Sequence, residues 1–130
     1  MQSVNILAIA AATIVSMALG FLWYSDYLFG KVWAKLSNNK MDKDGSSIYI
    51  IPTICFLALN SVFAYLLSSL KLTGLTEALV LGFFLWLGFS AVAIYVSNVF
   101  QQKSLKLFLI DSGYILACIL ASSILLTLLK

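Results

Sequence analysis

The stretch VNILAIAAATIVSMALGFLWY, residues 4–24, decides the class of fold because it contains no charged residue. A helix needs about 20 mostly apolar residues to cross a hydrocarbon core of about 30 Å. Similar segments follow at about residues 48–70, 77–100 and 107–129, and they lack the polar outer face that a soluble bundle helix requires. The sequence therefore predicts a single transmembrane domain over residues 1–130. Its fold class is all-α, an integral membrane four-helix bundle of two antiparallel hairpins, with the first span at about residues 4–25.

The composition supports this class and excludes others. The chain is 62% hydrophobic and 10% charged, whereas about a quarter of the residues in soluble domains are charged. It has no histidine or arginine, and Cys55 and Cys118 both lie in apolar segments. Cysteines in such positions are typical small buried hydrophobes. We therefore expect no metal site, no cofactor and no nucleic-acid partner, and we expect membrane lipids around the spans.

Residues 26–36, DYLFGKVWAKL, differ from the spans on either side. Apolar residues recur at helical spacing on one side of this segment, while Asp26, Lys31 and Lys35 lie on the other. This pattern predicts a short amphipathic helix at the membrane interface. We also expect Trp23, Tyr27 and Trp33 to lie at headgroup depth with Lys31 and Lys35. The polar residues 37–47 predict a solvated loop.

The distribution of lysines predicts the orientation. The connections after the first and third spans hold Lys31, Lys35, Lys40, Lys43, Lys103 and Lys106, whereas the opposite side holds Lys71 and Lys130. Cytoplasmic connections are enriched in lysine and arginine. The loop at residues 37–47 and the link after the third span are therefore expected in the cytoplasm, with both termini outside.

Small residues recur at every fourth position in three of the spans. The first span has Ala8, Ala12, Ser16 and Gly20, the last span has Gly113, Ala117 and Ala121, and the third has Gly74, Ala78 and Gly82. Small residues allow the close backbone approach that drives helix association in lipid. These faces are predicted to pack against other helices, within the chain or between subunits.

Few polar residues fall inside the spans. Asp111 lies about one turn inside the last span, where an ionisable residue is a functional candidate. Alternatively, the free N–H groups at the helix start stabilise its carboxylate. Asn60 is expected to bridge helices or to contact a substrate. Asn98 and Tyr24 should share the depth of Asp111, so these four residues define a candidate polar pocket; the alternative is an aromatic belt that faces headgroups.

Two motifs resemble one family of small bacterial membrane proteins. The run GFLWYS at residues 20–25, followed by LFGK at 28–31, is similar to the opening of the DUF1761 family. The segments GFFLW at 82–86, NVF at 98–100 and 107–114, which include Asp111, are similar to its second half. The resemblance implies a four-span protein of unknown function. Ile115 stands where that family often has histidine, so no catalytic residue is transferred.

No residue is therefore predicted to be catalytic, and we do not expect an enzyme. The sequence favours a structural or accessory subunit that packs through its small-residue faces, with a homo-oligomer or another membrane protein as partner. The alternative is an oligomeric small transporter or channel with a polar path near Asp111, Asn98 and Asn60.

Overall fold

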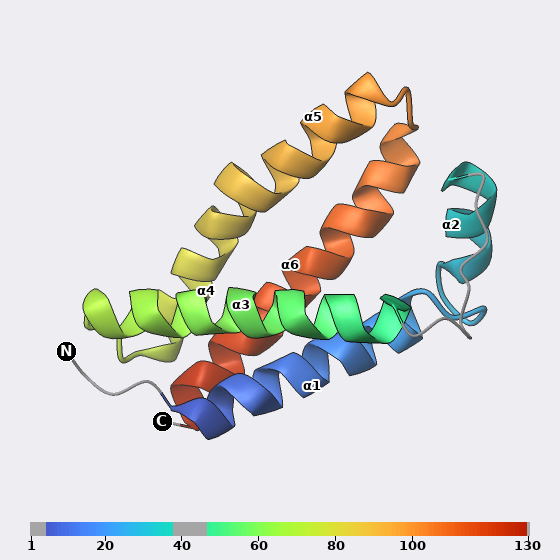
Figure 1. Ribbon diagram of the computed structural model, residues 1–130. Coiled ribbons are helices and arrows are strands. Elements are labelled where there is room, and N and C mark those ends of the chain that lie inside the picture. Colours follow the sequence, from blue (N-terminus) through green and yellow to red (C-terminus); the bar gives the residue numbers. More distant parts are fainter. Residues whose placement is uncertain (1–4, 38–46, 130) are drawn as a thin grey trace.

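The computed structural model describes residues 5–37 and 47–129, and each regular element in these ranges is a helix (Figure 1). The helices are α1 (Ile6–Trp23), α2 (Gly30–Ser37), α3 (Ser47–Ser69), α4 (Leu75–Leu85), a π-helical segment η1 (Trp86–Ala91), α5 (Val92–Phe100) and α6 (Leu105–Leu128). The helices α1, α3, α4–η1–α5 and α6 are each long and apolar enough to cross a membrane. The all-α fold predicted from the sequence is confirmed.

Helix α6 lies at the centre of the packing. It contacts α1 and α4 extensively, while α3 packs mainly on α1. The core contains Ala8 and Ile9 of α1, Phe63 and Leu67 of α3, Ala78 of α4, and Ile119 and Leu126 of α6. Farther along, α5 leads away from α1 and α3 and packs mainly on α6 (Figure 1).

Both chain ends lie at one end of the molecule. The side chain of Asn5 caps α1 by accepting hydrogen bonds from the backbone N–H groups of Leu7 and Ala8, at 3.0 and 3.2 Å. Its amide also donates to the carbonyl of Leu129, after the end of α6. The α3–α4 link lies at this end, while α2 and the α5–α6 link lie at the other (Figure 1). The chain therefore crosses between its two ends four times.

The predicted amphipathic helix over residues 26–36 is shorter in the structure. Residues 24–29 form a tight turn, in which the N–H of Phe29 donates to the carbonyl of Trp23 and the N–H of Gly30 to that of Ser25, both at 3.0 Å. A Cβ atom at Gly30 would lie 2.2 Å from the carbonyl oxygen of Tyr24, so this turn requires glycine. The chain bends here, and α2 begins only at Gly30. The predicted loop at residues 37–47 lies, apart from its two ends, outside the described ranges.

The third span, expected as one regular helix over residues 77–100, widens in its middle into η1. The wide turn begins at Trp86, whose indole N–H donates to the carbonyl of Ser112 in α6 at 2.8 Å. Such π-helical turns are rare and frequently lie at functional sites. In this span the turn separates α4, which packs closely on α6, from the more exposed α5.

Candidate functional site

Asp111 forms a hydrogen bond with Tyr24 that joins the last span to the end of the first. The phenol of Tyr24, the residue after α1, donates to a carboxylate oxygen of Asp111 at 2.7 Å, and both side chains are partly buried. The charge of Lys103 and the side chain of Trp33 in α2 also act on the same carboxylate. Asp111 therefore links α1, α2 and α6.

The position of Asp111 explains why it bonds to side chains. Helix α6 begins at Leu105, and the hydroxyl of Ser104 accepts a hydrogen bond from the N–H of Leu107 at 3.2 Å. Asp111 lies beyond this first turn, where the backbone N–H groups already have partners within the helix. The hydrogen bond to its carboxylate comes from Tyr24 in a neighbouring element, and Lys103, which precedes α6, acts on it through its charge.

Aromatic rings surround this bond. The ring of Tyr24 lies edge-on to Trp33, with centroids 5.8 Å apart, and edge-on to Tyr114, at 5.4 Å. Phe56 of α3 also lies edge-on to Tyr114, at 5.9 Å. Aromatic pairs in this geometry stabilise a fold beyond the area that they bury. We name Tyr24, Trp33, Asp111 and Tyr114 the carboxylate–aromatic centre.

Two indoles fix the turn of α6 that carries Asp111. Trp23 of α1 donates to the carbonyl of Ile110 at 2.9 Å, and Trp86 of the third span donates to that of Ser112 at 2.8 Å. The two acceptors flank Asp111 in the sequence. In addition, the phenol of Tyr114 donates to the carbonyl of Ser16 in α1, at 2.8 Å. The site is therefore held by three of the four spans.

The structure divides the four residues of the predicted polar pocket. Tyr24 and Asp111 meet, whereas Asn60 is fully buried and donates to the hydroxyl of Thr13 in α1 at 3.2 Å. Thr13 lies eleven residues before Tyr24, or about 16 Å along the helix. Asn60 therefore bridges α3 and α1 at a different depth, and the predicted pocket of four is wrong in this respect.

Asn98 contacts neither member of the pair through any described hydrogen bond. It is buried at the end of α5, where its backbone carbonyl accepts from the N–H of Lys103 at 2.9 Å. Its side-chain nitrogen has no hydrogen-bond partner among the described residues, and neither does the side-chain oxygen of Asn60 or of Ser122. Buried polar groups are normally paired.

The small-residue faces pack within the chain at several positions. Ala8, Ala12 and Ser16 are at most 1% exposed. On α6 the predicted Gly113, Ala117 and Ala121 are only half-buried, and the face that turns inward carries Ser112, Cys118, Ser122 and Ser123 instead. The spacing of small residues thus predicts the packing face well on α1 and only approximately on α6.

Three residues predicted to be interfacial have different environments. Tyr27 is 92% exposed, whereas Trp23 and Trp33 are half-buried against the carboxylate–aromatic centre. The ring of Trp23 packs over Gly113, where a Cβ atom would lie 3.3 Å from it. Trp23 therefore faces α6, and its position at headgroup depth stays a prediction. Lys31 and Lys35 are exposed on α2.

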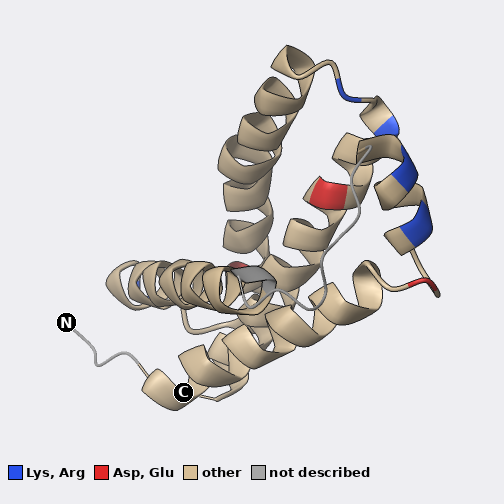
Figure 2. Cartoon of the chain, turned by 45° about the vertical axis from the view of Figure 1, so that its right-hand side comes forward, with Lys and Arg blue, Asp and Glu red and all other residues tan. Residues whose placement is uncertain are grey.

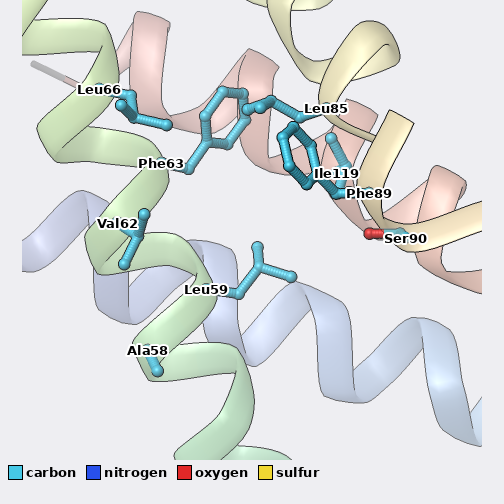
Figure 3. A pocket seen from close by; sticks show the side chains of 9 residues that line it. All are labelled: Ala58, Leu59, Val62, Phe63, Leu66, Leu85, Phe89, Ser90 and Ile119. Atoms are coloured by element: carbon cyan, nitrogen blue, oxygen red, sulfur yellow. The ribbon is translucent and has the colours of Figure 1, made fainter. Parts of the chain in front are cut away.

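An apolar pocket of about 370 Å³ opens between α3, the third span and α6 (Figure 3). It is lined by Ala58, Leu59, Val62, Phe63, Leu66, Leu85, Phe89, Ser90 and Ile119. Ser90 is the only one of these with a polar side chain. Because the lining belongs to segments long and apolar enough to span a membrane, a hydrocarbon chain matches its chemistry.

The fold and these contacts define a class: a multi-pass helical membrane protein whose spans meet at a partly buried carboxylate–aromatic centre. Comparison with protein families gives the family. The model of the family described as "Protein of unknown function (DUF1761)" matches residues 7–127, so the chain belongs to this family. No curated protein and no solved structure matches the chain.

Proposed function

We propose that this protein is a non-enzymatic structural or accessory subunit, which associates in the membrane with further copies of itself or with another membrane protein. The observation that carries this proposal is the exposure of the third span. Only 11% of its most apolar 18-residue stretch is buried within the chain, against 39% in α6. A helix–helix contact on this span would use apolar residues such as Val80, Phe84 and Leu87, all of which are exposed.

The arrangement of polar groups supports a non-enzymatic role. The carboxylate of Asp111 accepts a hydrogen bond from the phenol of Tyr24, and the charge of Lys103 acts on it as well, so its partners belong to the chain itself. The hydroxyls of Thr13, Ser16, Ser112 and Ser123 donate to carbonyls one turn earlier in their own helices. These bonds satisfy polar groups within the bundle, and we assign none of them a chemical step.

The proposal places the protein in the bacterial inner membrane, with α2 and the α5–α6 link in the cytoplasm and both termini outside. The lysine asymmetry supports this orientation. The hydrogen bond between Asn5 and the carbonyl of Leu129 agrees with it in one respect, because it holds the two chain ends on the same side.

Cross-linking in the native membrane tests association through the third span. In a Cys55→Ser background, where the remaining Cys118 is buried, a cysteine introduced at Phe84 or Leu87 should form an inter-chain disulfide or cross-link to a co-purifying protein. The matched control is Ile14→Cys, which is also exposed but lies on α1. Native mass spectrometry in mild detergent should then show a defined oligomer or complex. A monomer without partner or cross-link at either position would contradict the proposal.

An oligomeric transporter is the second candidate, because Asp111 lies in a spanning helix and, among the described residues, forms no ion pair. If it carries protons or cations, Asp111→Asn should abolish a flux in proteoliposomes while the protein remains folded. A variant with lower thermal stability and no change in flux would assign Asp111 a structural role.

A further inference from the structure

Four lysines from two segments far apart in the sequence lie at one end of the molecule. Lys31 and Lys35 belong to α2, while Lys103 lies in the α5–α6 link and Lys106 in the first turn of α6. All four are exposed. Figure 2 shows that α2 and the α5–α6 link approach each other at this end. We name these four residues the lysine surface.

The carboxylate–aromatic centre holds the two halves of this surface together. Helix α2 contacts α6, the phenol of Tyr24 donates to Asp111 in the second turn of α6, and the ring of Trp33 in α2 packs edge-on against Tyr24. The arrangement therefore depends on tertiary contacts. Without them, Lys31 and Lys35 would not be held beside Lys103 and Lys106.

The charges at this end do not cancel. Four lysines face two described aspartates, Asp26 in the turn before α2 and Asp111 below the surface. The structure shows no ion pair within 4 Å among residues 5–37 and 47–129, but the charge of Lys103 acts on Asp111, whose carboxylate accepts a hydrogen bond from Tyr24. Among the described residues, the lysine surface therefore carries a net positive charge that Asp111 offsets only in part.

The surroundings of the lysines identify the kind of partner. Next to Lys103 and Lys106 lie Phe100 and Leu105, which are 83% and 60% exposed at the ends of two spanning segments. An anionic phospholipid can interact with both kinds of side chain: its phosphate can bind the lysines, and its acyl chains can contact the apolar side chains. A soluble acidic protein would leave the apolar side chains without a partner.

We propose that the lysine surface binds the headgroup of an anionic phospholipid, with Lys31 and Lys35 on one side of the phosphate and Lys103 and Lys106 on the other. Basic residues beside spanning helices attract anionic headgroups, each by about 1 kcal/mol, which corresponds to a factor of about five in affinity. Lysine side chains are long enough to extend along apolar surface to the headgroup. This site is independent of the accessory role proposed above.

The test compares lipid retention by variants in nanodiscs with equal amounts of phosphatidylglycerol and phosphatidylcholine. Native mass spectrometry of the released protein measures the ratio of the two lipids that remain bound. The wild-type protein should retain phosphatidylglycerol preferentially, and Lys31→Gln/Lys35→Gln and Lys103→Gln/Lys106→Gln should each lower this preference several-fold. Circular dichroism verifies that each variant is folded. Lys71→Gln is the matched control, because Lys71 is exposed in the α3–α4 link at the other end.

The variant Asp111→Ala distinguishes two explanations of lipid binding: a site whose lysines are positioned by tertiary contacts, and a general attraction between positive and negative charges. The substitution removes a negative charge, so a purely electrostatic surface would retain more phosphatidylglycerol. If Asp111 positions α2, the same variant should instead retain less, although all four lysines remain. The proposal is overturned if either lysine pair can be removed without effect, if Lys71→Gln has the same effect as the pairs, or if Asp111→Ala increases retention.

Discussion

At the scale of single residues, Gly20 shows how a small side chain supports the carboxylate–aromatic centre. A Cβ atom at this position would lie 2.7 Å from the hydroxyl oxygen of Tyr114, closer than packed atoms allow. That hydroxyl donates to the carbonyl of Ser16, one turn earlier in α1. Gly20 therefore makes room for an aromatic side chain of α6, in addition to lying in line with the small residues of α1.

We expect Gly20→Ala to destabilise the protein by about 1–3 kcal/mol, the usual effect of overpacking a filled site. The added methyl group displaces the Tyr114 hydroxyl and breaks its bond to Ser16. Denaturant titration in detergent micelles measures the change in the free energy of unfolding.

Two further variants test this explanation. In Gly20→Ala/Tyr114→Phe the hydroxyl is absent, so the double variant should lose less stability than the sum of the two single variants. Gly88→Ala is the control, since its Cβ atom would meet nothing within 4 Å. Additive effects of Gly20→Ala and Tyr114→Phe would show that the hydroxyl is not the obstacle.

At the scale of elements, α3 and α5 end in the same way. Lys71 and Gln102 have φ angles of 57° and 58°, the left-handed conformation that usually belongs to glycine at the end of a helix. In each case the next residue donates its N–H to a carbonyl five residues earlier: Leu72 to Leu67 and Lys103 to Asn98, both at 2.9 Å. Two non-glycine residues therefore reverse the chain between antiparallel spans.

Gln102→Gly should stabilise the protein by up to about 1 kcal/mol. The left-handed conformation costs other residues about 1–2 kcal/mol, and the greater freedom of glycine in the unfolded chain offsets part of the gain. The melting temperature in detergent should rise accordingly.

Gln101→Gly provides the control for this substitution. Gln101 has φ and ψ angles of −89° and 3°, which any residue adopts. Glycine should therefore lower the melting temperature at this position. If both variants change stability in the same direction, strain at Gln102 is not the cause.

At the scale of the whole molecule, the two ends differ in charge and in composition. One end carries the lysine surface and the turn at residues 24–29, and the other carries the start of α1, the end of α6 and the α3–α4 link (Figures 1 and 2). Between them, α4, η1 and α5 leave an apolar face exposed beside the pocket of Figure 3. The difference in charge between the two ends supports an orientation in the membrane. The exposed apolar face of α4, η1 and α5 supports a partner within the membrane.

Reporter fusions in a bacterial host test the orientation. Alkaline phosphatase fused after Lys130 should be active, because this enzyme folds only outside the cytoplasm. The same reporter inserted within residues 38–46 should be inactive. Reversal of both results would place the lysine surface outside and contradict the proposed topology.

The amino-acid sequence determined which segments span the membrane and which connections are basic. Both follow from local properties: about 20 apolar residues suffice for a span, and lysines need no folding to be counted. The buried stripe of Ala8, Ala12 and Ser16 was predictable for the same reason, since its spacing is a property of one helix. Asp111 could also be selected as a candidate from the sequence, because a carboxylate inside a span is rare.

Only the tertiary structure decided what these residues contact. Tyr24 and Asp111 are 87 residues apart in sequence, and the hydrogen bond between them depends on how α1 and α6 pack. The separation of Asn60 from this pair, and the inward position of Trp23, follow from helix rotation and depth, which depend on the neighbouring helices. The packing of the helices therefore decides that Tyr24 and Asp111 form a hydrogen bond and that Asn60 does not join them.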